Sequence, residues 1–339
     1  MKTLMPLLNA IPKKTKMKIL VVGKDTMLHW PQNVCDALDT MGYENDLFLI
    51  NHLGFVSDTL ISLVKKFKKL SSEELLAHYF HQKINEFKPD VIMLISAFFM
   101  PQSLYDVLKN LPKKPYIIGW SGDAFNQDVA PLVHILDKLY CTDSFFVDVA
   151  HSTYGWKNVE YLPLAYNPKI FFPSNIPDEQ RKDTLFIGSP APDRVEILKS
   201  IQTPITLIGS AWKKHPLSLH TRVTKNIALN QIVPLYQSCR AVLNMKQGAN
   251  VRNGLNMRSF EATACGALMI HDNVADIEKH FVPNKEILVY NNAKELNTLL
   301  QEIEKNPQLF YTIAHEGMQR TLLEHSYQHR MSIILDTLS

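Results

Sequence analysis

Glycine is scarce in this chain, with 12 among 339 residues. Neither G-x-G-x-x-G nor G-x-x-x-x-G-K-[ST] occurs, and the first strand-like segment is followed only by Gly23 and Lys24. A dinucleotide-binding oxidoreductase or a P-loop protein needs such glycines so that its backbone can approach phosphate groups. Both classes are therefore excluded, while Gly23, Lys24 and His29 stay candidates for a loop that contacts a phosphate or an acceptor.

Cysteine is also sparse. The four cysteines are far apart and form no C-x-x-C pair, which argues against a disulfide scaffold or a structural zinc site and fits a reducing compartment. No group of residues has the spacing of metal ligands, and the sequence has no G-x-S-x-G or comparable nucleophile motif. The sequence thus predicts no bound metal and no cofactor.

Long apolar runs and a large charge excess are missing as well. No apolar run approaches the about 18 residues that span a bilayer, and the amino end MKTLMPLLNAIPKKTK has its lysines mostly after the apolar stretch, the wrong order for a secretory signal. Lys and Arg number 36 against 33 Asp and Glu, a net charge of +3. That excess is too small for a dedicated nucleic-acid-binding protein but suits an anionic ligand. We expect a cytoplasmic globular protein.

Short β-branched and apolar runs recur along the chain, each followed by a helix-like stretch. Runs that are apolar without alternation are typical of strands buried on both faces of a parallel sheet. The pattern therefore predicts an α/β fold throughout. The predicted strands are KILVVG (18–23), NDLFLI (45–50), DVIMLIS (90–96), YIIGWSGD (116–123), KLYCTD (138–143), NVEYLP (158–163), TLFIGS (184–189), ITLIGS (205–210), AVLNM (241–245), ALMIHD (267–272) and EILVYN (286–291).

A proline-rich segment at 163–183 separates two sets of strands of similar size. Two domains joined by such a crossover predict a cleft between them, and ligands of parallel sheets bind beyond the carboxyl ends of the strands. The expected division is a first Rossmann-like domain (1–165), a linker (166–183), a second Rossmann-like domain (184–325) and a C-terminal helix (326–339) that packs back towards the first domain.

An insertion at 57–88 is predicted to form a long helix or a helix pair. It places Lys65, Lys66, Lys68 and Lys69 among apolar residues. A basic amphipathic helix can dock on an anionic membrane, although such a face is more often solvated. A peripheral contact with the inner face of a membrane therefore stays open.

The strongest local signal is NMRSFEATACGALMIHD at 256–272. Asn256 is placed to cap a helix whose first amides, near Met257, attract phosphate oxygens, and Arg258 adds a cation in the first turn. Glu261 follows three residues later on the same helix face, where a carboxylate can accept hydrogen bonds from ribose hydroxyls. An intrahelical ion pair between Arg258 and Glu261 is the alternative.

Other strand ends bring cations and a carboxylate towards the same cleft. Lys246 and Arg252 follow one strand, and a Gly188-Ser189 turn with Arg194 follows another, an arrangement that suits a diphosphate. In the first half, Asp123 ends a strand and is the candidate base, with a helix cap as its alternative. Weaker candidates for the base are His29 and His151.

Taken together and in this order, these motifs resemble the GT-B glycosyltransferases, specifically the spore-maturation-protein (CgeB-like) branch of the group 1 family. The resemblance covers most of residues 116–338, and its most specific part is R-x-F-E-x-x-A-C-G. The matching segments are GWSGD, YCTD, GWKNVEYLPLAYNPKIFFP, FIGSPAPDR, LIGSAW (207–212), LNMK (243–246), RSFEATACGALMI (258–270) and EHSYQHR (324–330).

The resemblance implies two Rossmann-like domains that face a central cleft, with the acceptor bound mainly by the first domain (1–165) and the nucleotide-sugar donor mainly by the second (184–325). It also implies a metal-independent transfer of sugar from a nucleoside-diphosphate sugar to a hydroxyl acceptor (glycan, lipid, protein or other). Glu261 would hold the donor ribose. Arg258 and the amides near Asn256 and Met257 would meet the diphosphate, assisted by Arg194.

One position departs from the family pattern. Retaining relatives carry E-x7-E, and 261 − 8 = 253 is Asn253 here. Retention of configuration therefore cannot be transferred to this chain, and an inverting displacement with Asp123 as base becomes the working hypothesis. A sugar-nucleotide epimerase on the same fold and a non-catalytic sugar-nucleotide-binding protein stay as alternatives.

Overall fold

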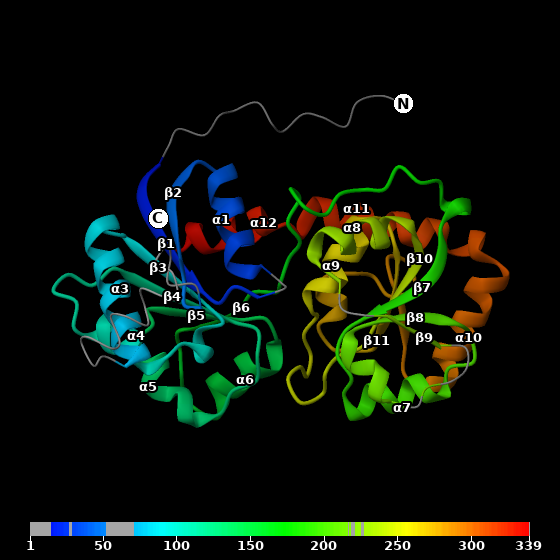
Figure 1. The fold of residues 1–339 in the computed structure, drawn as a ribbon, viewed down its shortest axis with the longest axis horizontal. Coiled ribbons are helices and arrows are strands. Elements are labelled where there is room, and N and C mark those ends of the chain that lie inside the picture. Colours follow the sequence, from blue (N-terminus) through cyan, green and yellow to red (C-terminus); the bar gives the residue numbers. More distant parts are fainter. Residues whose placement is uncertain are drawn as a thin grey trace.

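The computed structural model describes residues 15–26, 29–51, 71–215, 217, 221–224 and 227–338. Within these ranges the chain forms two α/β lobes that lie side by side, each built on one sheet (Figure 1). The α/β class predicted from the apolar runs is confirmed. None of the helices in the described ranges is long and apolar enough to cross a membrane.

The first lobe contains a six-stranded sheet in the order β2-β1-β3-β4-β5-β6, and every pair in it is parallel. Its central strands carry no polar alternation because helices cover both faces; all five residues of β3 are buried. The strands are β1 (Thr15–Gly23), β2 (Tyr43–Leu49), β3 (Val91–Ile95), β4 (Tyr116–Ser121), β5 (Lys138–Cys141) and β6 (Val159–Tyr161).

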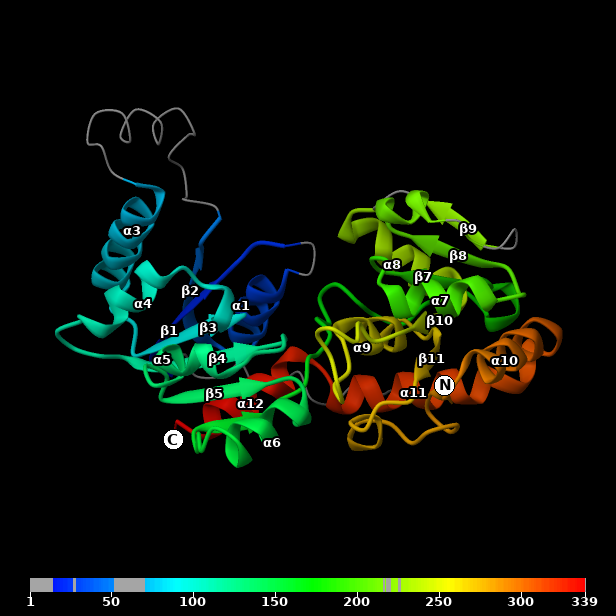
Figure 2. The same cartoon turned by 90° about the horizontal axis from the view of Figure 1, so that it is seen from below.

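Helices connect these strands on both sides of the sheet (Figures 1 and 2). They are α1 (Trp30–Thr40), α3 (Ser72–Phe87), α4 (Gln102–Lys109), α5 (Ala130–Val133) and α6 (Ser144–Ser152). Ser71 and Glu74 form a capping box that begins α3. This helix is the described part of the predicted 57–88 insertion; Lys65, Lys66, Lys68 and Lys69 lie outside the described residues.

The second lobe repeats the architecture with a parallel sheet in the order β12-β11-β10-β7-β8-β9. The predicted runs account for each of its strands except β9, whose sequence TRVT carries no apolar run. The strands are β7 (Lys182–Ile187), β8 (Ile205–Ile208), β9 (Thr221–Thr224), β10 (Cys239–Asn244), β11 (Leu268–Asp272) and β12 (Leu288–Tyr290). The associated helices are α7 (Pro192–Ser200), α8 (Leu229–Ser238), α9 (Met257–Ala264), α10 (Ala293–Lys305) and α11 (Tyr311–Glu324).

Each sheet has a topological switch point, where the strand order reverses and the connections leave in opposite directions. In the first sheet it lies between β1 and β3, and in the second between β7 and β10. Ligands of open α/β sheets bind beyond the carboxyl ends of the strands at this point. The fold therefore nominates two ligand positions, one in each lobe.

The last helix, α12 (Tyr327–Asp336), leaves the second lobe and packs against α1 of the first, beside which it lies in Figure 1. Its buried Arg330 donates hydrogen bonds to the carbonyls of Pro163 and Leu164 in the crossover and of Glu324 at the end of α11. The EHSYQHR motif thus fixes the path of both chain crossings between the lobes.

Short 3-10 turns complete the described structure, and one of them, Ile277–Lys279, lies at the contact between the lobes. The others are Ala97–Phe99, Gln127–Val129, Asp178–Gln180, Ser210–Lys214 and Pro307–Phe310.

Candidate functional site

The switch point of the second lobe is held together by Arg194. This arginine is buried, and its guanidinium donates to the carbonyls of Ser189 (3.0 Å), Met245 (2.7 Å) and Lys246 (3.3 Å). Burial, together with the positive charge of Arg258, lowers the pKa of Arg194 to about 10, so the group stays charged at neutral pH. The sequence predicted a free cation that faces a diphosphate; the structure instead places Arg194 as a brace between the ends of β7 and β10.

Lys246 also makes hydrogen bonds within the second lobe, through both its backbone and its side chain. Its backbone amide donates to the Asp272 carboxylate (3.1 Å), and its ammonium donates to the carbonyl of Arg252 (3.3 Å). The Gly188 amide bonds to the carbonyl of Ile208, which joins the predicted Gly-Ser turn to the neighbouring strand. These contacts order the loops on either side of the switch point.

Asn244, the last residue of β10, organises the start of α9. It is fully buried, and its side-chain amide donates to Asn256 Oδ1 (3.1 Å) and Ser259 Oγ (2.8 Å). Its side-chain oxygen Oδ1 accepts hydrogen bonds from Asn256 Nδ2 (2.8 Å) and from the Arg258 guanidinium (2.9 Å). The sequence analysis missed this residue, because a strand-end asparagine carries no pattern of its own.

The amino end of α9 keeps its first amides free. Asn256 occupies the N-cap position as predicted, but its side chain pairs with Asn244 and makes no capping bond to the helix. No described residue accepts a hydrogen bond from the backbone amides of Met257 or Arg258. Free amides at a helix start attract anions, and the Arg258 guanidinium, oriented by Asn244, adds a positive charge there. This point can bind a phosphate group.

Glu261 lies one turn further along α9 and is 8% exposed. The alternative of an ion pair with Arg258 is not realised, since Arg258 bonds to Asn244 and no described residue donates a hydrogen bond to the Glu261 carboxylate. Burial raises the pKa of Glu261 to about 7, although the Arg258 charge opposes this shift. An unpartnered carboxyl group beside a phosphate-binding turn is suited to accept hydrogen bonds from sugar hydroxyls.

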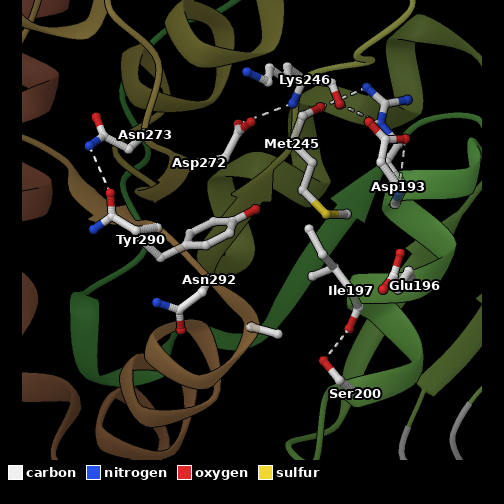
Figure 3. A pocket seen from close by; sticks show the side chains of 13 residues that line it. Asp193, Glu196, Ile197, Ser200, Met245, Lys246, Asp272, Asn273, Tyr290 and Asn292 are labelled. Carbon is white, nitrogen blue, oxygen red and sulfur yellow. Dashed lines mark hydrogen bonds between the residues drawn. The ribbon is translucent and has the colours of Figure 1, made fainter.

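A cavity of about 570 Å³ lies on the other side of the Met245–Lys246 strand end, between α7 and the start of α10 (Figure 3). It is lined by Asp193, Glu196, Asp272, Tyr290 and Asn292, among others, and neither Arg258 nor Glu261 reaches it. Its lining carries three carboxylates (Asp193, Glu196 and Asp272) and two cations (Arg194 and Lys246). Because negative groups outnumber positive ones, the cavity is poorly suited to bind a diphosphate.

The loop between β10 and α9 also bridges the two lobes. Asp143, the N-cap of α6 in the first lobe, accepts hydrogen bonds from the backbone amides of Arg252 (2.7 Å) and Asn253 (3.0 Å). Next to it, a Cβ atom on Gly254 would lie 2.7 Å from the carbonyl oxygen of Thr142. Only glycine therefore permits this approach of the two lobes.

Asn253 is part of the same bridge. Its side-chain amide donates to Ser144 Oγ (3.1 Å), and Ser144 donates in turn to the fully buried Asp276 carboxylate (2.6 Å). The position that carries glutamate in E-x7-E is therefore a structural contact in this chain, surrounded by the carboxylates of Asp143 and Asp276.

Asp123 lies on the first lobe's side of the bridge. Its carboxylate accepts a hydrogen bond from the side-chain amide of Asn250, whose oxygen accepts from the Ala124 amide (3.0 Å). The alternative that Asp123 caps a helix is wrong, since Asn126 and Val129 are the caps of the elements that follow. Asp123 and Lys24 line a cavity at the switch point of the first sheet.

The two candidate histidines, His29 and His151, have different surroundings in the structure. His151 Nε2 bonds to the carbonyl of Val159 at 2.8 Å, a contact within the first lobe that makes it structural. His29 is the N-cap residue of α1, in a left-handed conformation, with Nδ1 3.6 Å from the Asp25 carboxylate.

Gly23 lets Pro31 approach the end of β1, because a Cβ atom at position 23 would lie 2.4 Å from Pro31 Cγ. Within the described residues, no three His, Cys, Asp or Glu side chains are grouped so as to hold a metal.

The second lobe is similar in sequence to known glycosyltransferase-like proteins. The sequence model of the family described as "Glycosyl transferase-like" matches residues 193–336. The spore protein CgeB of Bacillus subtilis (strain 168) is 25% identical over 212 residues, which are 56% of this chain and 66% of that protein.

Solved structures agree on the fold. A glycosyltransferase from Rickettsia africae matches with a TM-score of 0.68 and 14% identity over 95% of this chain and 97% of its own. Anabaena HepE in complex with UDP-glucose matches with a TM-score of 0.67 and 12% identity over 95% and 99%. The predicted GT-B architecture is confirmed.

The raised pKa of Glu261 predicts a pH-dependent stability. The folded state favours the protonated carboxyl, so the wild type should lose stability relative to Glu261→Gln as the pH rises from about 4.5 to about 7. The full difference is about 3 kcal/mol. Urea denaturation at several pH values measures it, with the exposed Glu304→Gln as control. A difference between Glu261→Gln and wild type that does not change with pH would contradict the burial of a titrating carboxyl.

The bridge predicts the effect of restoring the family's glutamate. Asn253→Glu would bring a third carboxylate beside Asp143 and Asp276 and remove the donor to Ser144, so we expect a loss of about 2–4 kcal/mol of unfolding free energy. Asn253→Gln, which keeps the amide, should cost clearly less. Equal stability of the Glu and Gln variants in urea denaturation would refute the structural role.

Proposed function

We propose that this protein, whose residues 193–336 match the glycosyl transferase-like family model, transfers a sugar from a nucleoside-diphosphate sugar to a hydroxyl group of an acceptor. The supporting observation is the start of α9, where two free backbone amides, the Asn244-oriented Arg258 and the unpartnered Glu261 follow each other. This order matches the parts of a donor molecule: diphosphate, then ribose.

The donor diphosphate is bound by the amides of Met257 and Arg258 and by the Arg258 guanidinium, which can donate two hydrogen bonds to phosphate oxygens. Glu261 accepts from the ribose hydroxyls. These cationic and amide groups stabilise the negative charge of the leaving diphosphate, so the transfer requires no metal ion; an assay with EDTA tests this part. UDP-glucose is the first donor to test, because Anabaena HepE was solved with it.

The acceptor is activated by Asp123. Its carboxylate takes the proton of the acceptor hydroxyl while the hydroxyl oxygen forms a bond to the anomeric carbon and the bond from that carbon to the diphosphate breaks. Asn250 holds one oxygen of Asp123, and no described residue donates to the other. With Asn253 committed to the bridge, a single displacement with inversion is the reaction that these residues support.

The Arg258 role predicts a selective binding defect. Arg258→Ala should weaken UDP binding about tenfold or more, because a charge-assisted bidentate contact contributes about 1.5–3 kcal/mol, while uridine, which has no phosphate, should bind as before. Isothermal titration calorimetry with both ligands measures the two affinities. Equal losses for UDP and uridine would show that Arg258 acts only through the fold.

The Asp123 role predicts a loss of rate without a loss of donor affinity. Asp123→Asn keeps an acceptor oxygen for Asn250 but cannot take a proton, so transfer should slow by about 10²–10⁴-fold. The UDP dissociation constant should stay the same. Near-normal turnover of the Asn variant would remove Asp123 as the base and return His29 to consideration.

Two alternatives give different results in the same assays. An epimerase would convert the donor sugar with no acceptor present. A non-catalytic binding protein would bind the nucleotide sugar without transfer or hydrolysis across a panel of acceptors.

A further inference from the structure

The first lobe contains a cavity that the donor does not need. It lies beyond the ends of β1 and β3, at the switch point of the first sheet, and has a volume of about 450 Å³. This is within the range of pockets that bind small organic molecules. Asp123, the proposed base, forms part of its wall.

The lining of this cavity is mostly apolar. Polar side chains are contributed by Lys24, Thr26, Ser96 and Asp123, and the buried indole N–H of Trp30 has no hydrogen-bond partner among the described residues. The other lining residues are Trp30, Pro31, Ile50, Ile95, Phe99 and Met100. A sugar acceptor has hydroxyl groups on both faces of its ring, and several of them would lose water against such a wall without gaining a partner.

Two aromatic side chains give the cavity its shape. Trp30 is buried and packs edge-to-face on Trp120 with ring centroids 5.1 Å apart, so its indole is a fixed part of the wall. Phe99, in contrast, is 55% exposed, so its ring is accessible to a ligand that enters the cavity. An exposed aromatic ring and a fixed one in the wall of the same cavity are suited to hold a flat apolar molecule.

We propose that this cavity binds the acceptor and that the acceptor is a small molecule with its hydroxyl on an apolar ring system, such as a phenol or a hydroxylated fused ring, rather than another sugar. This inference rests on the function proposed above. The apolar body of the molecule lies against Trp30 and Phe99, and its hydroxyl points to Asp123.

Direct binding of probe molecules tests the inference without requiring transfer. The probes are 4-methylumbelliferone, a fluorescent hydroxylated fused ring, and maltose, a disaccharide acceptor. Saturation-transfer NMR and fluorescence titration with the full-length protein should show 4-methylumbelliferone binding and no maltose binding.

The matched variants are Phe99→Ala and Phe172→Ala. Both phenylalanines are about half exposed (55% and 51%), so neither change should unfold the protein, but Phe172 lies in the crossover and outside the cavity. Loss of the ring contact should weaken 4-methylumbelliferone binding about tenfold in Phe99→Ala and leave it unchanged in Phe172→Ala. Maltose binding that Phe99→Ala abolishes, or 4-methylumbelliferone binding that both variants leave intact, overturns the proposal.

The result is separable from the test of the proposed function. If UDP binds and 4-methylumbelliferone does not, the apolar acceptor is wrong and the transferase stands. If 4-methylumbelliferone binds through Phe99 but forms no glycoside with any donor that binds, the cavity is not an acceptor site and the proposal falls. Formation of 4-methylumbelliferyl glycoside, lost in Asp123→Asn, supports both.

Discussion

The arrangement of the two lobes depends on one buried carboxylate. Asp143 caps α6 in the first lobe and accepts the amides of Arg252 and Asn253 from the second. A buried carboxylate without hydrogen-bond partners is energetically costly, so Asp143 keeps the 250–254 loop in the position where the amides of Arg252 and Asn253 can donate to it. This contact brings Asn250 to Asp123 and fixes the loop that leads into α9. The proposed base and the proposed donor site are thus positioned by the same interaction.

The bridge also explains the departure at Asn253. An asparagine can donate to Ser144 between two buried carboxylates, whereas a glutamate there would add a third negative charge. The function proposed for α9 has a cost of its own, since burial without a partner leaves the Glu261 carboxyl with a raised pKa. A ligand that supplies hydroxyl donors relieves this cost, which is why an unsatisfied carboxyl in this place favours binding over a purely structural role.

The sequence predicted most of the fold because buried parallel strands are continuous apolar runs, as in β3 and β10; β9 was missed because TRVT is short and polar. It also predicted Arg258 and Glu261, whose helical spacing is local. It could not predict that the Arg194 guanidinium donates its hydrogen bonds to backbone carbonyls, since every residue has a carbonyl and the sequence does not show which ones come close. The contact between Asp143 and the 252–253 amides could not be predicted either, because Asp143 and Arg252 are 109 positions apart in the sequence.

The most direct test of the account is a structure of the protein with UDP bound. The account predicts the diphosphate at the amides of Met257 and Arg258, and the ribose hydroxyls within hydrogen-bond distance of Glu261. One other position in the second lobe competes in such an experiment, because the cavity lined by Asp193 and Tyr290 is large enough to hold a ligand. UDP found in that cavity, with the start of α9 empty, would contradict the central claim.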